Sequence, residues 1–200
     1  NFNKKKFLQA INYYNASPES FYQRITNILP EDFNIQNLFF LRFTHRAGSG
    51  RFHLKKELHL SHQQSPHSNE NNEHYCRRWI SLNVLKDIST SNNGHEFDIQ
   101  ISHYPNDNQS YLVFSSATKD PFKENHFRSI SVGLLINRQL KRKIAFIEDD
   151  TINTQEVGVT CERCTIIDCK VRQVPAKFVE KSIKNNTIEA VVEDLTKKFS

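Results

Sequence analysis

Apolar residues recur at helical spacing at the start of the chain and predict two successive helices. The first is an amphipathic segment whose apolar positions are Phe7, Leu8, Ile11 and Tyr14. The second is expected to begin at Ser17-Pro18-Glu19, because serine caps helices, proline suits the first helical position and glutamate is favoured near the positive end of the helix dipole. Its apolar face consists of Phe21, Ile25, Ile28 and Leu29, and Pro30 is expected to end it.

The middle of the chain has the apolar and polar alternation that is typical of β-strands. Residues 38–43 are apolar on both faces and predict a central strand, and a turn at Ala47-Gly48-Ser49-Gly50 leads to a half-buried strand at 51–60. Residues 61–73 are polar and predict a loop, and apolar residues after Cys76 predict a short helix. Further strands are expected at 96–104, 109–118, 127–136 and near 144–148.

A last helix is predicted to start near Asn186-Thr187, where Glu189 completes a capping-box arrangement. Helices at both ends of a mostly antiparallel sheet indicate an α+β fold, and our specific hypothesis is a sensor domain of the GAF or PAS kind. We expect an N-terminal helical segment (1–30), an α+β sensor-like domain (31–150), and a Cys-rich segment with the C-terminal helix (151–200), forming one compact unit overall.

Composition narrows the class of protein without identifying it. Two hundred residues with 37% hydrophobic and 24% charged content are typical of a soluble globular chain. No apolar run approaches the roughly 20 residues of a membrane span, so we expect a cytoplasmic protein that does not contact membranes. The net charge of +5 comes from scattered residues, so a solvated surface is favoured about threefold over a DNA-binding face.

The cysteines are the most informative residues. Cys161, Cys164 and Cys169 form a C-x2-C-x4-C cluster, and Cys76 precedes it by 85 positions. Closely spaced cysteines in a cytosolic protein more often bind metal or carry redox chemistry than form structural disulfides. Because zinc and iron–sulfur clusters take four ligands, we predict that all four cysteines converge on zinc or an iron–sulfur cluster, which the purified protein can lose. Inert buried thiols or disulfides are about equally favoured.

Basic side chains and histidines are the other candidates for a functional site. Positive side chains near the cysteines would favour the thiolate form; these are Arg77, Arg78, Arg163, Lys170 and Arg172. A histidine-rich region contains His53, His59, His62, His67 and His74. Its spacing matches no metal-ligand motif, so solvated surface residues are favoured about fourfold over a metal site. The chain has no GxSxG, P-loop or GxGxxG motif and no convincing catalytic set, so we expect no enzyme.

Two stretches resemble a known family. The segment His74-Tyr75-Cys76-Arg77-Arg78-Trp79 is similar to the "CPLW" segment of the C-terminal domain of short-chain fatty-acyl regulators, which are bacterial Xre-type transcription factors. The segment from Val157 to Cys164, with Asp168-Cys169 and Arg172-Gln173-Val174-Pro175, resembles that domain's closing "G..CR.C.R.DC..RA.P" signature. The similarity spans roughly residues 5–180, and the chain departs from it where Arg77-Arg78 replaces Pro-Leu.

This resemblance implies the C-terminal regulatory or sensor domain of a bacterial transcription regulator. It would contact DNA through a helix-turn-helix domain N-terminal to residue 1 and respond to a small-molecule effector or to a change at the cysteine site. A homodimer is a separate expectation. A sensor is expected to have an apolar cavity between the sheet and a helix, lined by residues such as Phe97, Ile99, Val113 and Phe114. The alternatives are a zinc-stabilised interaction domain without sensing and, least favoured, a hydrolase using the histidine-rich face.

Overall fold

The structure is a computed structural model that describes residues 3–60, 73–91 and 93–199. The chain divides into two compact units. The first contains the described residues up to 60 together with Arg77–Val157, and the second contains residues 73–76 together with the described part of Gly158–Ser200. Each unit is described by itself below.

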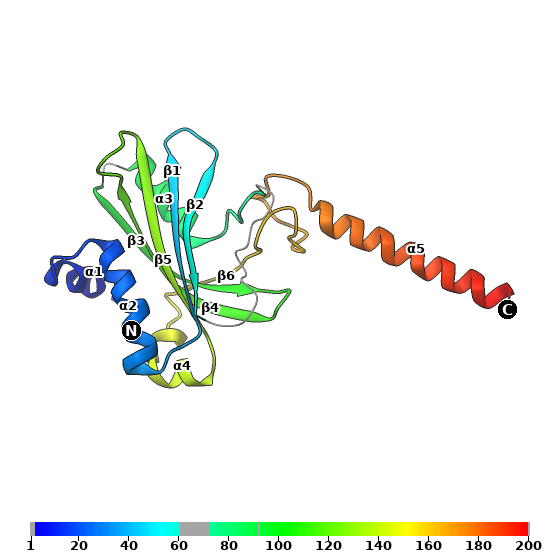
Figure 1. Ribbon diagram of the computed structural model, residues 1–200, viewed down its shortest axis with the longest axis horizontal. Coiled ribbons are helices and arrows are strands. Elements are labelled where there is room, and N and C mark those ends of the chain that lie inside the picture. Colours follow the sequence, from blue (N-terminus) through cyan, green and yellow to red (C-terminus); the bar gives the residue numbers. More distant parts are fainter. Residues whose placement is uncertain (1–2, 61–72, 92, 200) are drawn as a thin grey trace. The chain divides into compact units, whose positions relative to one another are not determined.

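Within the described residues, the first unit is built on one six-stranded sheet with the strand order β2-β1-β5-β4-β3-β6 (Figure 1). All neighbouring strands are antiparallel except β3 and β6, which are parallel. The strands are β1 (Leu38–Arg46), β2 (Phe52–His59), β3 (His95–Tyr104), β4 (Gln109–Lys119), β5 (His126–Leu135) and β6 (Asn153–Glu156). The first five lie where the hydrophobic alternation predicts them, so the α+β class with a mostly antiparallel sheet is confirmed.

The two N-terminal helices cover one face of this sheet. Helix α1 (Lys4–Tyr13) is capped by Asn3, and helix α2 (Pro18–Phe33) by Ser17, whose side chain accepts a hydrogen bond from the Ser20 N–H. Phe7 of α1 stacks on Phe97 of β3 with ring centroids 4.7 Å apart. The core on this face takes alternate residues from the central strands, among them Phe40, Ile99, Leu112, Phe114, Ile130 and Val132.

Helix α3 (Ile80–Thr90) packs on the opposite face of the sheet, where β4 and β5 present several small side chains. Ser115 and Ser131 are fully buried and hydrogen-bonded to each other at 2.8 Å, and the Ser131 hydroxyl donates to Ser81 of α3 at 2.8 Å. Small hydroxyl side chains let a helix approach the sheet closely while their polar atoms remain satisfied. The helix predicted after Cys76 is thus confirmed.

Gly133 occupies a position on β5 where no side chain fits. It lies opposite Phe39 of β1, and a Cβ atom at Gly133 would come within 2.1 Å of the Phe39 ring. Phe39 is buried, so its ring has little room to move. We expect Gly133→Ala to lower the free energy of unfolding by about 1–3 kcal/mol through overpacking. Urea denaturation followed by circular dichroism tests this, and Gly94→Ala, where a Cβ meets nothing within 4 Å, is the matched control.

Two predicted helix ends and one predicted strand are wrong. Pro30 does not end α2, which continues to Phe33 and stops at Asn34 in the left-handed conformation (φ 50°). The last turn gains a partner that offsets part of the lost backbone hydrogen bond, because the Phe33 carbonyl accepts a hydrogen bond from the Lys143 ammonium.

The region 144–148 is not a strand. It forms the short 3-10 helix η1 (Ala145–Glu148) after helix α4 (Arg138–Lys143), which Asn137 caps by accepting from the Leu140 N–H. The sixth strand, β6, lies further along and is polar. Helix α5 (Lys177–Phe199) begins nine residues before the predicted Asn186, so the supposed capping box lies inside the helix. The loop predicted at 61–73 falls almost entirely outside the described residues.

Candidate functional site

All four cysteines belong to the second unit. Cys76, Cys161 and Cys164 are buried, Cys169 is partly exposed, and no disulfide joins them. The unit draws them from two segments that are far apart in the sequence, residues 73–76 and the stretch that follows Gly158. The organisation of these two segments therefore decides which cysteines can act together.

Backbone pairing holds the two segments side by side. Tyr75 and Thr160 form an antiparallel bridge, the Cys76 N–H donates to the Val159 carbonyl at 3.1 Å, and the Cys161 N–H donates to the His74 carbonyl at 2.8 Å. Antiparallel pairing of this kind fixes the register between the strands. Cys76 and the C-x2-C turn are consequently neighbours in space despite their separation in sequence.

Gly158 lies between two of the sulfur atoms. Its N–H donates to Cys76 Sγ at 3.4 Å, and a Cβ atom placed on it would lie 2.8 Å from Cys164 Sγ. Cys161 Sγ accepts a hydrogen bond from the Gln173 N–H, also at 3.4 Å. N–H donors aimed at sulfur stabilise negative charge on that atom, as is usual around metal-bound thiolates. Among the described residues, however, no three His, Cys, Asp or Glu side chains are grouped closely enough to hold a metal ion.

A buried carboxylate fastens the cysteine segments together. Glu73 accepts hydrogen bonds from Thr160 Oγ1 and from Arg163 Nε, the latter at 3.0 Å, and Arg163 Nη2 lies 2.9 Å from Glu73 Oε1. Burial alone would raise the pKa of Glu73, but the hydrogen bonds and the charge of Arg163 outweigh burial and hold this pKa below its ordinary value. The carboxylate is thus ionised and shared by residues on both sides of Cys161.

The cations that sequence reasoning placed around the thiols have other bonds. Arg172 donates to the carbonyl oxygens of Cys161 at 2.8 Å and Cys164 at 3.3 Å, which closes the C-x2-C turn. In the first unit, Arg77 donates to the Gly50 carbonyl at 2.7 Å and Arg78 to the Glu156 carbonyl at 3.3 Å. These arginines position backbone, which is a structural use of their charge.

The histidines are dispersed. His53 and His59 lie on β2, where His59 Nε2 is 2.6 Å from a Glu57 carboxylate oxygen. His74 in the second unit pairs with Glu162 at 2.8 Å. His62 and His67 lie outside the described residues. The described histidines gather no set of ligands for a metal.

The first unit contains an apolar cavity of about 280 Å³ between the sheet and the N-terminal helices. Its lining is Phe7, Tyr22, Ile25, Ile28, Leu29, Phe33, Phe114, Val132, Leu134 and Ile144. The Tyr22 hydroxyl hydrogen-bonds Ser116 Oγ at 3.0 Å, and burial raises the pKa of this phenol, so it stays neutral. The cavity therefore offers an uncharged, hydrophobic environment of the size of a small ligand.

Of the four residues expected to line such a cavity, Phe114 does so. Phe97 and Ile99 are buried in the core on the same face of the sheet, and Val113 is buried on the opposite face, because neighbouring residues of a strand alternate. Sequence reasoning missed the contribution of α2, whose residues Ile25, Ile28 and Leu29 supply much of the wall. Their helical spacing was the available signal, and it was used only to predict the apolar face of the second helix.

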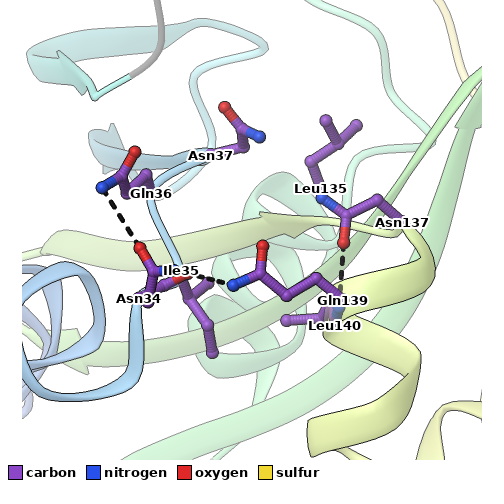
Figure 2. Close-up of a pocket in the computed structure, with 8 residues that line it drawn as sticks. All are labelled: Asn34, Ile35, Gln36, Asn37, Leu135, Asn137, Gln139 and Leu140. Carbon is purple, nitrogen blue, oxygen red and sulfur yellow. Dashed lines mark hydrogen bonds between the residues drawn. The ribbon is translucent and has the colours of Figure 1, made fainter.

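A second, polar hollow of about 150 Å³ lies where α2 leads into β1 (Figure 2). Figure 2 shows that its amide side chains are largely engaged with each other and with backbone: Gln36 Nε2 donates to Asn34 Oδ1 at 3.2 Å, and Gln139 Nε2 donates to the Asn34 carbonyl at 2.7 Å. Asn137 caps α4. These bonds stabilise the turn between α2 and β1. No charged side chain lines the hollow.

Comparison of the chain with protein-family models, with curated proteins and with solved structures gave no match. The helices of the described residues were also searched for a membrane span, and none has the necessary combination of length and apolar character.

Proposed function

We propose that this chain is a regulatory domain of a bacterial transcription regulator and that its sheet unit binds a small apolar effector. The observation that carries the proposal is the cavity of about 280 Å³ beneath α1 and α2. For comparison, an apolar cavity of about 150 Å³ is large enough to bind benzene. The cavity is partly open to solvent, so a small ligand can enter it.

The surroundings of the cavity fit an effector that changes the conformation of the domain. Two of its walls come from separate elements, the sheet and α2, and a ligand that contacts both would stabilise their packed arrangement. An effector shifts a two-state equilibrium only as far as its affinities for the two states differ. An antiparallel sheet with helices on its faces and a cavity under one layer supports the narrower proposal of a GAF-like or PAS-like sensor.

The cysteine segments supply the second part of the proposal. We propose that Cys76, Cys161, Cys164 and Cys169 together bind zinc or an iron–sulfur cluster, or respond to oxidation as thiols. Support comes from the pairing of residues 74–76 with 159–161 and from the N–H groups directed at two of the sulfurs. Binding by all four requires the four sulfur atoms to come closer together, because no three-ligand group exists among the described residues.

A structural role is the second candidate for this site. The Glu73 bonds to Thr160 and Arg163 already join the two segments without any metal, and a zinc ion at the cysteines would reinforce the same junction. Effector binding by the sheet unit does not depend on which role is correct. The two parts of the proposal are therefore tested separately.

Filling the cavity tests the effector site. We expect the wild-type protein to bind naphthalene, an apolar fluorescent probe, and Val132→Phe to weaken that binding at least about tenfold, because the larger ring occupies the cavity that Val132 lines. Leu58→Phe on the exposed edge strand β2 is the control and should leave binding unchanged. Fluorescence titration measures both. Equal affinity in wild type and Val132→Phe would exclude this cavity as the binding site.

A further inference from the structure

Helix α5 is long, yet its side chains are exposed to solvent. It runs for 23 residues, and every described side chain from Glu180 to Lys198 is exposed. Most helical stability in proteins comes from the packing of an apolar face, and intrinsic propensity contributes less. β-branched residues such as Thr187, Val191 and Val192 lower its intrinsic propensity further. The helix therefore needs a surface to pack against.

One side of α5 provides an apolar stripe. With 3.6 residues per turn, Ile188, Val191, Val192 and Leu195 fall within an arc of about 100°. Their side chains are 51%, 54%, 55% and 48% exposed, respectively. Ile183 is also exposed, at 61%, but it lies on the other side of the helix. Between Lys184 and Lys198 the large apolar side chains therefore all lie on one face, whereas the first half of the helix has apolar residues on other sides as well.

The stripe follows a heptad pattern. With Ile188 and Leu195 at d positions, Val192 occupies the intervening a position and Asn185 the preceding one. A β-branched residue at a with leucine at d favours two strands, and a single asparagine at an a position fixes register in such pairs. Asn185 and Val192 at a positions and Leu195 at a d position therefore match residues favoured in two-stranded coiled coils, over two heptads that follow Lys181 at the preceding d position.

Charges beside the stripe favour one orientation. Lys184 and Lys198 occupy g positions and Glu189 occupies an e position. In a parallel pair, Lys184 of one helix faces Glu189 of the other helix, which is an attractive contact. In an antiparallel pair centred on the stripe, g positions face g positions, so Lys184 would face Lys198. A second copy of this helix, running parallel, is complementary to the first in both shape and charge.

We propose that the protein forms a parallel homodimer through α5, with the stripe Ile188, Val191, Val192 and Leu195 at its centre. This does not depend on the effector site, which lies in the other unit. In a regulator it would hold two copies in a defined orientation.

Sedimentation equilibrium of the full chain at about 50 µM tests the proposal, a concentration that resolves dimers of micromolar affinity. We expect a dimer for wild type and at least about a tenfold weaker association for Ile188→Glu, since a carboxylate cannot be buried at a d position. Ile183→Glu makes the same change off the stripe and should leave the dimer intact. A monomeric wild type, or equal losses in the two variants, would overturn the proposal.

Two further measurements test the orientation. Lys184→Glu alone should weaken the dimer by placing acidic side chains opposite each other, and adding Glu189→Lys should restore it. Val192→Cys should form a covalent dimer on mild oxidation because equivalent a positions meet only in a parallel pair, while wild type and Ile183→Cys treated identically should not. Absence of the Val192→Cys crosslink, or no rescue by the charge exchange, would contradict parallel pairing.

Discussion

Replacing both Cys161 and Cys164 with serine is expected to abolish metal binding by anaerobically purified protein. These thiols are buried in the C-x2-C turn, and a tetrahedral metal cannot be held by the two remaining cysteines alone. Elemental analysis should change from about one zinc per chain, or the equivalent iron and sulfide of one cluster, to nearly none. An absorption spectrum distinguishes the two metals, since an iron–sulfur cluster is coloured and zinc is not.

The control for this experiment comes from the same loop. Ile167 lies between the cysteines in sequence and is 90% exposed, so Ile167→Ser should leave the metal content unchanged. Wild-type protein that contains no zinc or iron after anaerobic purification would contradict metal binding. Mass spectrometry after mild oxidation would then show whether the cysteines form disulfides instead.

Replacing Glu73 with glutamine is expected to separate the two cysteine segments. The variant leaves the Arg163 guanidinium without its carboxylate, and loss of a buried charge-assisted hydrogen bond costs about 1–3 kcal/mol. Because the Arg163 side chain is 43% exposed, we expect the loss of stability to lie at the lower end of this range. Hydrogen exchange of the Cys76 and Cys161 amides, which bond across the junction, should accelerate at least about fivefold.

The same group gives the junction a dependence on pH. Because the pKa of Glu73 is lower in the folded protein than in the unfolded chain, the carboxylate contributes stability that is fully present above the unfolded value of 4.5. That contribution is lost as the pH falls through the lower, folded value. In Glu73→Gln this acid-dependent part of the exchange should be absent. Identical pH profiles for the two proteins would show that Glu73 does not stabilise the junction.

The strands of the first unit were predictable because burial of one strand face requires apolar residues to alternate with polar ones. Phe97, Ile99 and Ile101 alternate with polar residues along β3, and the asymmetric environment of the sheet requires that alternation. β6 has no such alternation. It is a polar edge strand that pairs with β3 through backbone atoms, and backbone hydrogen bonds do not depend on side-chain type.

The cysteine site was predictable only in outline. Spacing drew attention to Cys161 and Cys164, but no local pattern identifies Glu73, whose partners Thr160 and Arg163 lie more than 85 positions later. Glu73 is buried only because two distant segments pair in the folded chain. Such pairing produces no periodic pattern in the sequence. Pro30 shows the opposite error, since a reliable local rule was overridden by contacts of Phe33.

The pairing of residues 74–76 with 159–161 also has a consequence for synthesis on the ribosome. The first of these segments is translated before β3, β4 and β5, and the second is translated after them. At about 5–20 residues per second, several seconds pass before the second segment is translated, and during this time Cys76 lacks its pairing partner. The thiol is therefore most vulnerable to oxidation or to a wrong partner in the nascent chain, and the order of translation, more than the finished structure, sets that interval.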